Sequence, residues 1–318
     1  MYHGRRVAVV VPAYREAERI AETLRRVPAW VDRVVVVDDG SDDGTGERAR
    51  GAGDGRLALL RHERNRGVGA ALATGYREAR RLGADVVVVM AGDGQMHPDD
   101  LPALVEPVAR GRYEYVKGNR LRHPRAADMP ALRRAGTALL GRLTARAVGV
   151  PGLGDSQCGY TALAGELIDR LPLERLYPRY GYPNDLLSLV ALAGGRIGEA
   201  SVRPVYAGER SGLRPRHALV MLGLIARAGL RRRRARPRPL AAPAAAPPRP
   251  FAARATPLSC KRAAPRRTRR TRPASRSSPP PPSPAPGPGR RTPPSAAPPE
   301  WTPAPGRAAA LRETLARS

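Results

Sequence analysis

Short runs of consecutive β-branched residues recur in the first part of the chain. They are RVAVVV at residues 6–11, VVVV at 34–37 and VVVV at 86–89, with a weaker run at 57–60. Runs that are apolar at every position suit parallel strands that are covered on both faces, because neither face of such a strand meets water. The pattern therefore predicts parallel strands in a covered sheet.

Helical periodicity fills the segments between these runs. Within residues 16–27 the apolar side chains Ile20, Leu24 and Val27 recur at helical spacing, and residues 69–82 repeat the pattern. Strands that alternate with helices are typical of an α/β fold. The sequence thus predicts an open, mostly parallel sheet with helices on both faces.

Polar residues gather where three of the predicted strands end. These clusters are PAYRE at residues 12–16, DDGS at 38–41 and DGQ at 93–95. In open α/β sheets, ligands bind beyond the carboxyl ends of the strands, where the strand order reverses. We therefore expect a ligand site at this edge.

Each cluster also has a purely structural interpretation. Asp42 or Asp43 can cap the helix that follows, whereas the adjacent Asp38 and Asp39 suit either local pairing or hydrogen bonds to a nucleotide. The glycine-rich segment 64–75 lacks the spacing of a dinucleotide fingerprint. Close packing of a helix on the sheet is favoured there over a phosphate site.

The segment MAGDGQMHP at residues 90–98 contains one carboxylate between two glycines. Pro98 suits the first position of a helix, which leaves Asp93 and Gln95 unexplained. Mg²⁺ takes oxygen ligands, often one or two carboxylates together with substrate phosphates. Asp93 and the Gln95 amide oxygen are therefore candidate ligands for a metal bound to a diphosphate.

Three of these motifs together carry a family resemblance. PAYRE, VDDGSDDGT and GDGQMHPDD, in this order and spacing, resemble the family 2 glycosyltransferases with the GT-A fold, and among them the polyprenyl-phosphate sugar transferases. The resemblance covers roughly residues 7–213. In that family the third motif usually begins with a further acid, where this chain has Ala91. Half of the family's metal site is therefore missing here.

The same resemblance assigns further residues, each with a structural alternative. It places Arg120 of VKGNRL near the donor phosphates and Asp185 of YGYPNDLL near the acceptor. Arg120 is otherwise a surface arginine, and Asp185 otherwise a helix cap. The remaining residues implied on the sugar side and in a loop that closes over the diphosphate are Asp155 and Gln157 of DSQCGY, and Tyr206, Arg210 and Ser211 of RPVYAGERSGL.

The resemblance implies an inverting transfer of a sugar from a GDP- or UDP-linked donor, most simply to a polyprenyl phosphate. Asp93 and Asp185 are the implied catalytic residues, and Asp93 and Gln95 the implied ligands of Mg²⁺ or Mn²⁺. A phosphate acceptor is already anionic near neutral pH, so Asp185 would then orient it; a hydroxyl acceptor would require Asp185 as a base. The implied nucleotide contacts are Pro12, Tyr14, Glu16 and Asp39.

Composition divides the chain. Residues 231–318 hold 22 of the 35 prolines, 21 basic residues and 2 acidic ones, so +19 of the formal charge of +28 lies there. Such a segment buries too little apolar surface to offset its ordering entropy. We expect a GT-A domain over residues 1–213, a basic amphipathic helix over 214–234 and a Pro/Arg/Ala-rich disordered tail over 235–318.

Cysteine content and apolar runs bear on location. Two distant cysteines, Cys158 and Cys260, predict no disulfide framework, and no apolar signal segment opens the sequence. Residues 218–230 are too short for a membrane span and include Arg227. The helix over 214–234 suits a membrane interface and a terminal core helix equally. We expect a cytoplasmic protein; the membrane-interface alternative for this helix would place it peripherally at the inner face of the plasma membrane.

Three rival functions remain open. A nucleotidyltransferase would have a glycine-rich signature with a lysine after the first strand, which PAYRE lacks. A nucleic-acid binder would exploit the positive charge, but most of that charge is in the tail and no recognisable binding fold precedes it. We therefore expect no specific nucleic-acid partner. An inactive or repurposed transferase is compatible with Ala91.

Overall fold

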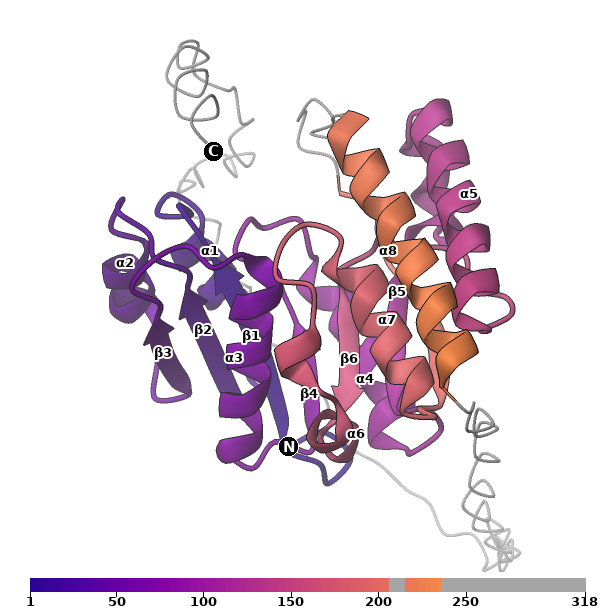
Figure 1. The fold of residues 1–318 in the computed structure, drawn as a ribbon. Coiled ribbons are helices and arrows are strands. Elements are labelled where there is room, and N and C mark those ends of the chain that lie inside the picture. The colour runs from indigo at the N-terminus through magenta and orange to yellow at the C-terminus, as the bar shows by residue number, and fades with distance from the viewer. Residues whose placement is uncertain (206–214, 236–318) are drawn as a thin grey trace, which may run out of the picture. The chain divides into compact units, whose positions relative to one another are not determined.

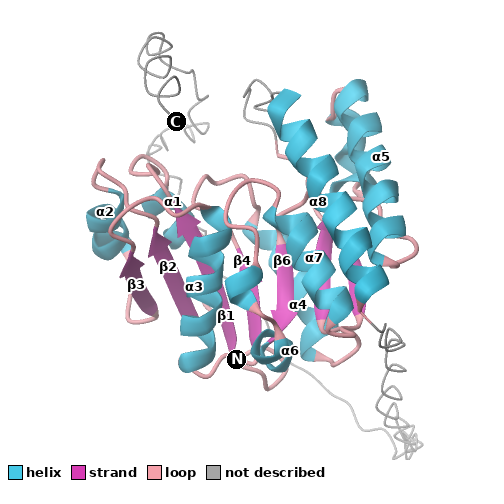
Figure 2. Cartoon of the chain, viewed as in Figure 1, coloured by secondary structure: helices cyan, strands magenta, loops and turns pink. Residues whose placement is uncertain are grey.

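The described part of the chain folds around one seven-stranded sheet (Figures 1 and 2). The computed structural model describes residues 1–205 and 215–235. The strand order is β3-β2-β1-β4-β6-β5-β7, and β6 runs antiparallel to both of its neighbours while the other pairs are parallel. The strands are β1 (Val7–Ala13), β2 (Arg33–Asp38), β3 (Leu57–Arg61), β4 (Val86–Val89), β5 (Tyr115–Asn119), β6 (Thr161–Ala164) and β7 (Ile197–Ser201).

Helices cover both faces of this sheet. One face carries α1 (Ile20–Arg25), α2 (Thr45–Ala52) and α4 (Leu101–Ala109), and the other carries α3 (Val68–Arg81), α6 (Gly165–Arg170) and α7 (Tyr182–Leu192). The long helices α5 (Ala131–Val148) and α8 (Pro215–Arg234) contact each other and α7 (Figure 1). Short 3₁₀ helices lie at Pro98–Asp100, Arg120–Arg122, Pro124–Asp128 and Leu173–Arg175.

The valine runs supply a core on each side of the sheet. In β1, Val10 packs into the cluster beneath α3, whereas its neighbours Val9 and Val11 pack into the cluster beneath α1 and α4. This follows from the two-residue period of a strand, because successive side chains point to opposite faces. The unbroken apolar runs therefore mark strands buried on both faces, and the predicted fold class is confirmed.

Helix α3 lies very close to the sheet at Gly75. A Cβ atom added there would lie 2.3 Å from Cγ1 of Val10. The glycine thus permits a helix-to-strand distance that any side chain would prevent. At Gly75 this is the close helix–sheet packing that the sequence favoured for the glycine-rich segment.

The strand order reverses at β1. Its two neighbours are β2 and β4, so the chain leaves β1 towards β2 and β3 and returns on the other side at β4. Ligand sites of open α/β sheets lie at such a switch point. The expected tail falls outside the described residues from residue 236 on. Within the described part, no helix has the length and apolarity needed to cross a membrane.

Candidate active site

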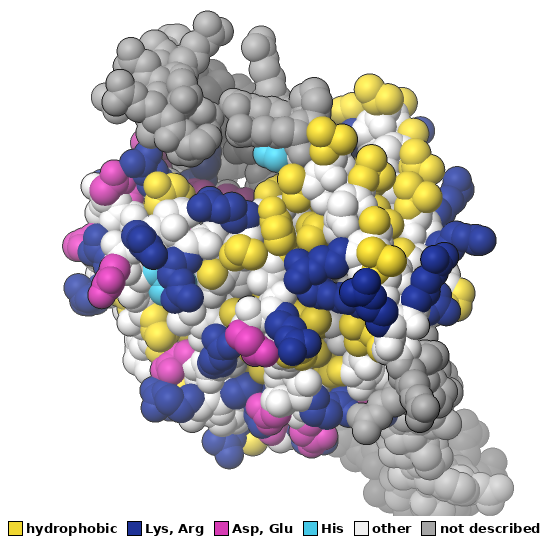
Figure 3. All heavy atoms as spheres, in the orientation of Figure 1, with side chains coloured by type: hydrophobic (Ala, Val, Ile, Leu, Met, Phe, Trp, Pro, Cys, Tyr) yellow, Lys and Arg dark blue, Asp and Glu magenta, His cyan; other side chains and the backbone are white. Residues whose placement is uncertain are grey.

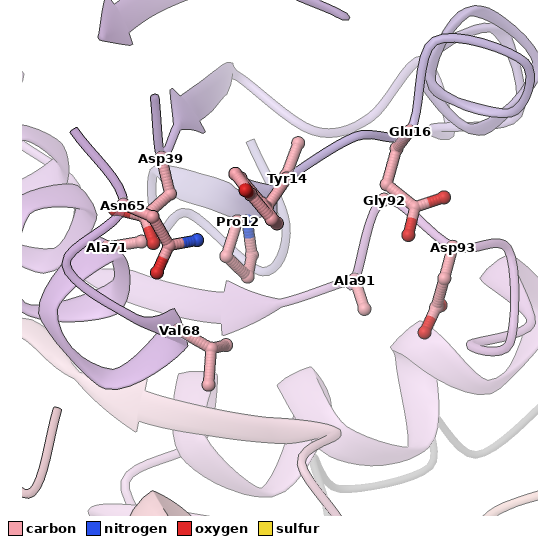
Figure 4. A pocket seen from close by; sticks show the side chains of 11 residues that line it. Pro12, Tyr14, Glu16, Asp39, Asn65, Val68, Ala71, Ala91, Gly92 and Asp93 are labelled. Carbon is pink, nitrogen blue, oxygen red and sulfur yellow. The ribbon is translucent and has the colours of Figure 1, made fainter. Parts of the chain in front are cut away.

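A pocket of about 270 Å³ opens at this switch point, beyond the carboxyl ends of β1, β2 and β4 (Figure 4). Five residues that the sequence motifs singled out meet in its wall: Pro12, Tyr14, Glu16, Asp39 and Asp93. Asp39 and Asn65 lie on one side of the pocket and Glu16 and Asp93 on the other (Figure 4). The remaining lining residues are Ala13, Val68, Ala71, Ala91 and Gly92.

Asp39 is buried at the pocket wall and holds the loop that precedes α3. Its Oδ2 accepts from the backbone N–H of Gly67 at 2.7 Å, and its Oδ1 accepts from Arg66 N at 3.0 Å and lies 2.6 Å from Nδ1 of His62. His62 in turn lies 3.0 Å from the Thr74 hydroxyl. The carboxylate therefore fixes the shape of this wall, in addition to lining it.

The loops after β1 and β2 are bound to each other. Ser41 Oγ accepts from Arg15 N at 3.0 Å, Thr45 Oγ1 accepts from Glu16 N at 2.9 Å, and Asp43 accepts from Ala17 N at 3.2 Å. Asp43 also accepts from Thr45 N, so it serves the first turn of α2 although Gly44 is the capping residue. These contacts place the PAYRE segment at the mouth of the pocket.

Asp93 and Gln95 share a turn after β4. Asp93 Oδ1 accepts from the Gln95 N–H at 2.9 Å, and Ala91 lines the pocket beside them. Within the described residues, no group of three or more histidine, cysteine, aspartate or glutamate side chains lies close enough together to hold a metal ion. This donor set fits a hard cation only if a bound diphosphate supplies further oxygens.

Arg120 and Asp155 were both expected at the donor, and they contact each other. Arg120 Nε lies 2.7 Å from Asp155 Oδ2, and Nη2 lies 3.1 Å from Oδ1. Burial pushes the pKa of Asp155 upward, but the charges of Arg120 and Lys117 outweigh it and hold the pKa below its usual value. Gln157 Nε2 donates to Ser156 and to Asn184. These residues do not line the pocket and form a neighbouring buried cluster.

Asp185 is buried in the first turn of α7, and both of its carboxylate oxygens are occupied. Oδ2 accepts from Tyr177 N at 2.8 Å, and Oδ1 pairs with Arg231 of α8 at 2.6 Å. Gly181, not Asp185, is the capping residue of α7. The structure thus holds Asp185 between a loop and α8, away from the residues that line the pocket.

Three expected residues, Tyr206, Arg210 and Ser211, lie outside the described residues. Cys158 is buried, and burial raises the pKa of its thiol, as suits a packed and unreactive side chain. Asn65 and Val68 of the pocket wall lie in the glycine-rich segment 64–75, for which the sequence favoured helix packing over a ligand site, so neither was assigned to the pocket. Sequence reasoning also missed the buried Lys117, whose amine donates to the Cys158 carbonyl.

Comparison with known proteins places the chain among sugar transferases. Residues 8–146 match the glycosyl transferase family 2 model. A UDP-N-acetylglucosamine–dolichyl-phosphate N-acetylglucosaminyltransferase from Methanococcus voltae is 28% identical over 216 residues, which cover 63% of this chain and 86% of that protein. An undecaprenyl-phosphate mannosyltransferase from Micrococcus luteus is 32% identical over 202 residues, which cover 62% of this chain and 82% of that protein.

Solved structures agree with this assignment. Glucosyl-3-phosphoglycerate synthase from Mycobacterium tuberculosis, in complex with UDP, superimposes with a TM-score of 0.52 at 26% identity and covers 71% of this chain and 81% of that chain. The motifs at the strand ends, the sheet order and the length of the shared sequence lead to one conclusion: the chain belongs to glycosyltransferase family 2.

Proposed function

We propose that the pocket binds a nucleoside-diphosphate sugar, linked to GDP or UDP. Tyr14 lines the pocket with 41% of its surface exposed, so its ring is available to a nucleotide base. Asp39 and Asn65 offer polar groups on the same wall. The observation that carries the proposal is the meeting of these residues and Asp93 at the switch point of the sheet, where ligands of open α/β sheets bind.

Asp93 and Gln95 would hold Mg²⁺ or Mn²⁺ together with the donor diphosphate. A cation there would stabilise the negative charge that develops on the departing nucleoside diphosphate. Asp93 and Glu16 lie on the same side of the pocket (Figure 4), so this side has two carboxylates, against Asp39 on the other. Ala91 replaces the first acid of the family motif, and we therefore expect metal affinity to depend on the diphosphate.

A lipid phosphate, of the polyprenyl class, is the acceptor that the site favours. Both carboxylate oxygens of Asp185 are engaged, by Tyr177 N and by Arg231, so this side chain is poorly placed to remove a proton from a hydroxyl. A phosphate monoester needs no such base, because its second pKa is about 6. The names of the relatives from Methanococcus voltae and Micrococcus luteus specify phosphate acceptors of this lipid class.

The proposed reaction is a single in-line displacement. An anionic oxygen of the acceptor phosphate attacks the anomeric carbon and forms the new C–O bond. The bond from that carbon to the donor diphosphate breaks, and the nucleoside diphosphate leaves with the electron pair. Configuration at the anomeric carbon is inverted, and no proton has to move in the bond-forming step.

The exposed surface of α5 and α8 suits contact with a membrane. Here six leucines, which we call the α5–α8 leucines, remain largely in water: Leu132, Leu139, Leu143, Leu219, Leu222 and Leu230. Leu132 is 88% exposed and Leu219 is 71% exposed. Figure 3 shows hydrophobic side chains gathered over these two helices, with basic side chains near them. The spacing of the leucines puts them in a stripe along each helix.

Charge favours an anionic membrane as the partner of this surface. The sequences of α5 and α8 contain ten arginines and no acidic residue. Two copies of this surface would repel each other, whereas anionic lipid headgroups would attract it. A membrane contact would also bring the enzyme to a lipid-linked acceptor.

Vesicle sedimentation tests the membrane contact. Wild type should bind vesicles that contain both neutral and anionic phospholipid, and this binding should weaken as the salt concentration rises. The double substitution Leu132→Ser and Leu219→Ser should weaken that binding about tenfold. If the variant binds as tightly as wild type, the leucines have no role in binding. If wild type binds vesicles of neutral phospholipid alone as tightly as the mixed vesicles, the arginines have none.

Thermal melting with UDP, GDP and ADP, each with and without Mg²⁺ or Mn²⁺, tests the donor site. A nucleotide at about 100 times its Kd adds roughly 2.7 kcal/mol to the free energy of unfolding. We expect UDP or GDP to raise the melting temperature more when metal is present, and Asp93→Asn to remove the metal-dependent part. Asp99→Asn, at an exposed acid of the same segment, is the matched control. If neither UDP nor GDP shifts the melting temperature, the donor-site proposal is wrong.

A further inference from the structure

Helix α8 is joined to the wall of the donor pocket by a series of direct contacts. The first of them is the ion pair between Arg231 and Asp185, in which the Asp185 side chain is 1% exposed and the Arg231 side chain 19%. Asp185 then accepts from the backbone N–H of Tyr177 at 2.8 Å. One buried carboxylate therefore fixes α8 and the loop before α7 to each other.

The loop at Tyr177 and Pro178 presses on the start of α3. The carbonyl oxygen of Pro178 accepts from Gly69 N at 2.7 Å. A Cβ atom added at Gly69 would lie 2.1 Å from the Tyr177 carbonyl oxygen, and one at Gly67 would lie 2.4 Å from that of Pro178. The two segments thus touch backbone to backbone, so a shift of this loop must move the beginning of α3.

The start of α3 is itself part of the pocket. Asn65, Val68 and Ala71 line it, and Asp39, which also lines the pocket, accepts hydrogen bonds from Arg66 N and Gly67 N of the same segment. The segment at residues 65–71 is therefore held between Asp39 on the pocket side and the Tyr177–Pro178 loop on the α7 side. Its position depends on both.

We propose that Arg231 is a positioning residue for donor binding. It fixes Asp185, Asp185 fixes the loop at Tyr177 and Pro178, and this loop sets the position of the pocket wall at residues 65–71. Arg231 touches no donor atom in this scheme, and Asp185 supports the site instead of reacting in it. The inference rests on the proposed function only in taking the pocket as the nucleotide site.

The scheme gives α8 a second role. Because the same helix carries part of the exposed leucine and arginine surface, contact of α8 with a membrane and occupation of the donor pocket are linked through Arg231. Linkage of this kind is reciprocal: the factor by which membrane contact changes nucleotide affinity is the factor by which bound nucleotide changes membrane affinity.

Calorimetric titration of the full chain with UDP and GDP, in the presence of Mg²⁺ or Mn²⁺, tests the proposal. Arg231→Ala should raise the Kd of the nucleotide about tenfold, and Arg231→Lys, which keeps a charge for Asp185, should restore most of the affinity. Arg170→Ala is the matched control, because it removes an arginine from a largely buried carboxylate, Glu114, at a different place. If the role of Arg231 were merely structural, Arg231→Ala and Arg170→Ala would weaken nucleotide binding equally.

Amide hydrogen exchange supplies the second measurement. Arg231→Ala should accelerate exchange at Tyr177 and Gly69, and Arg170→Ala should not. If wild type binds neither nucleotide, the donor-site proposal fails, while the exchange rates still decide whether Arg231 positions this wall. If Tyr177 and Gly69 exchange at the wild-type rate in Arg231→Ala, or if that variant binds nucleotide as wild type does, Arg231 is not a positioning residue.

Discussion

The guanidinium of Arg120 and the carboxylate of Asp155 form a two-point ion pair, with Arg120 20% exposed and Asp155 fully buried. Both residues were expected to contact the sugar donor. In the structure Asp155 instead joins the end of β5 to the segment before β6, because Arg120 also donates to it through its backbone N–H at 3.3 Å. Because the two residues pair with each other, we expect a substitution at either one to act first on the stability of the fold.

Arg120→Ala should therefore lower the free energy of unfolding by about 3–5 kcal/mol, because it leaves a buried carboxylate without its partner. Arg125→Ala is the control, since Arg125 and its partner Asp128 are both well exposed and should contribute at most about 1 kcal/mol. Urea denaturation measures both. If Arg120→Ala lowered the free energy of unfolding only slightly and raised the KM for the donor, Arg120 would instead be a contact of the donor phosphates.

Ala91→Asp should strengthen metal binding. The substitution restores a second carboxylate to the motif at the pocket, and hard cations bind more tightly as carboxylate ligands are added. We expect the affinity for Mn²⁺ in the presence of UDP or GDP to rise about tenfold, which is about 1.4 kcal/mol. Ala91→Asn, of similar size and without charge, should give no such gain. Equal metal affinity in wild type and Ala91→Asp would place the metal elsewhere.

Gly75→Ala should destabilise the fold by about 1–3 kcal/mol, since the new Cβ would collide with Val10 and force α3 away from the sheet. Gly136→Ala in α5 is the counterpart, because a Cβ there meets nothing within 4 Å. It should add roughly 0.5–1 kcal/mol through helix propensity. Chemical denaturation of both variants checks the sign of each effect; two effects of the same sign would refute the close packing at Gly75.

Lys117 gives the fold a specific dependence on pH. Burial lowers the pKa of Lys117 to about 8, against 10.5 for the free side chain. Between these values the unfolded chain holds a proton that the folded chain has released, so a rise in pH stabilises the fold. Below about pH 8 both states are protonated and the effect is constant.

The comparison of wild type with Lys117→Met isolates this effect, since other ionisable groups change little between the two proteins. The stability of wild type relative to the variant should rise by on the order of 3 kcal/mol from pH 8 to pH 10.5. Denaturation at several pH values gives the difference. A difference that stays flat over this range would show that Lys117 is charged in the folded protein.

Local patterns predicted the sheet and much of the pocket. The valine runs at β1, β2 and β4 are apolar on both faces, and this property determines their place inside the sheet. The polar residues directly after these strands then meet of necessity, because the carboxyl ends of parallel neighbours share one edge. The clusters at these strand ends contain Pro12, Tyr14, Glu16, Asp39 and Asp93, which the family resemblance assigned to the site and which line the pocket.

Contacts between distant segments could not be predicted from the sequence. Arg120 and Asp155 are separated by 35 positions, and Asp185 and Arg231 by 46. No periodicity links the members of either pair, so each carboxylate looked available for a ligand. The contact between the Tyr177–Pro178 loop and the start of α3 at Gly69 was equally unpredictable. It is made by backbone atoms, so the side-chain pattern shows nothing of it except the glycine itself.

The most direct test of the proposed function is sugar transfer by the full chain with Mg²⁺ or Mn²⁺, from UDP- and GDP-sugars to a short-chain polyprenyl phosphate, to the matching polyprenol and to 3-phosphoglycerate. We expect an inverted glycosyl phosphate from the polyprenyl phosphate alone, and loss of at least about 100-fold in rate for Asp93→Asn. Transfer to 3-phosphoglycerate or to the polyprenol, with none to the polyprenyl phosphate, would contradict the proposed function.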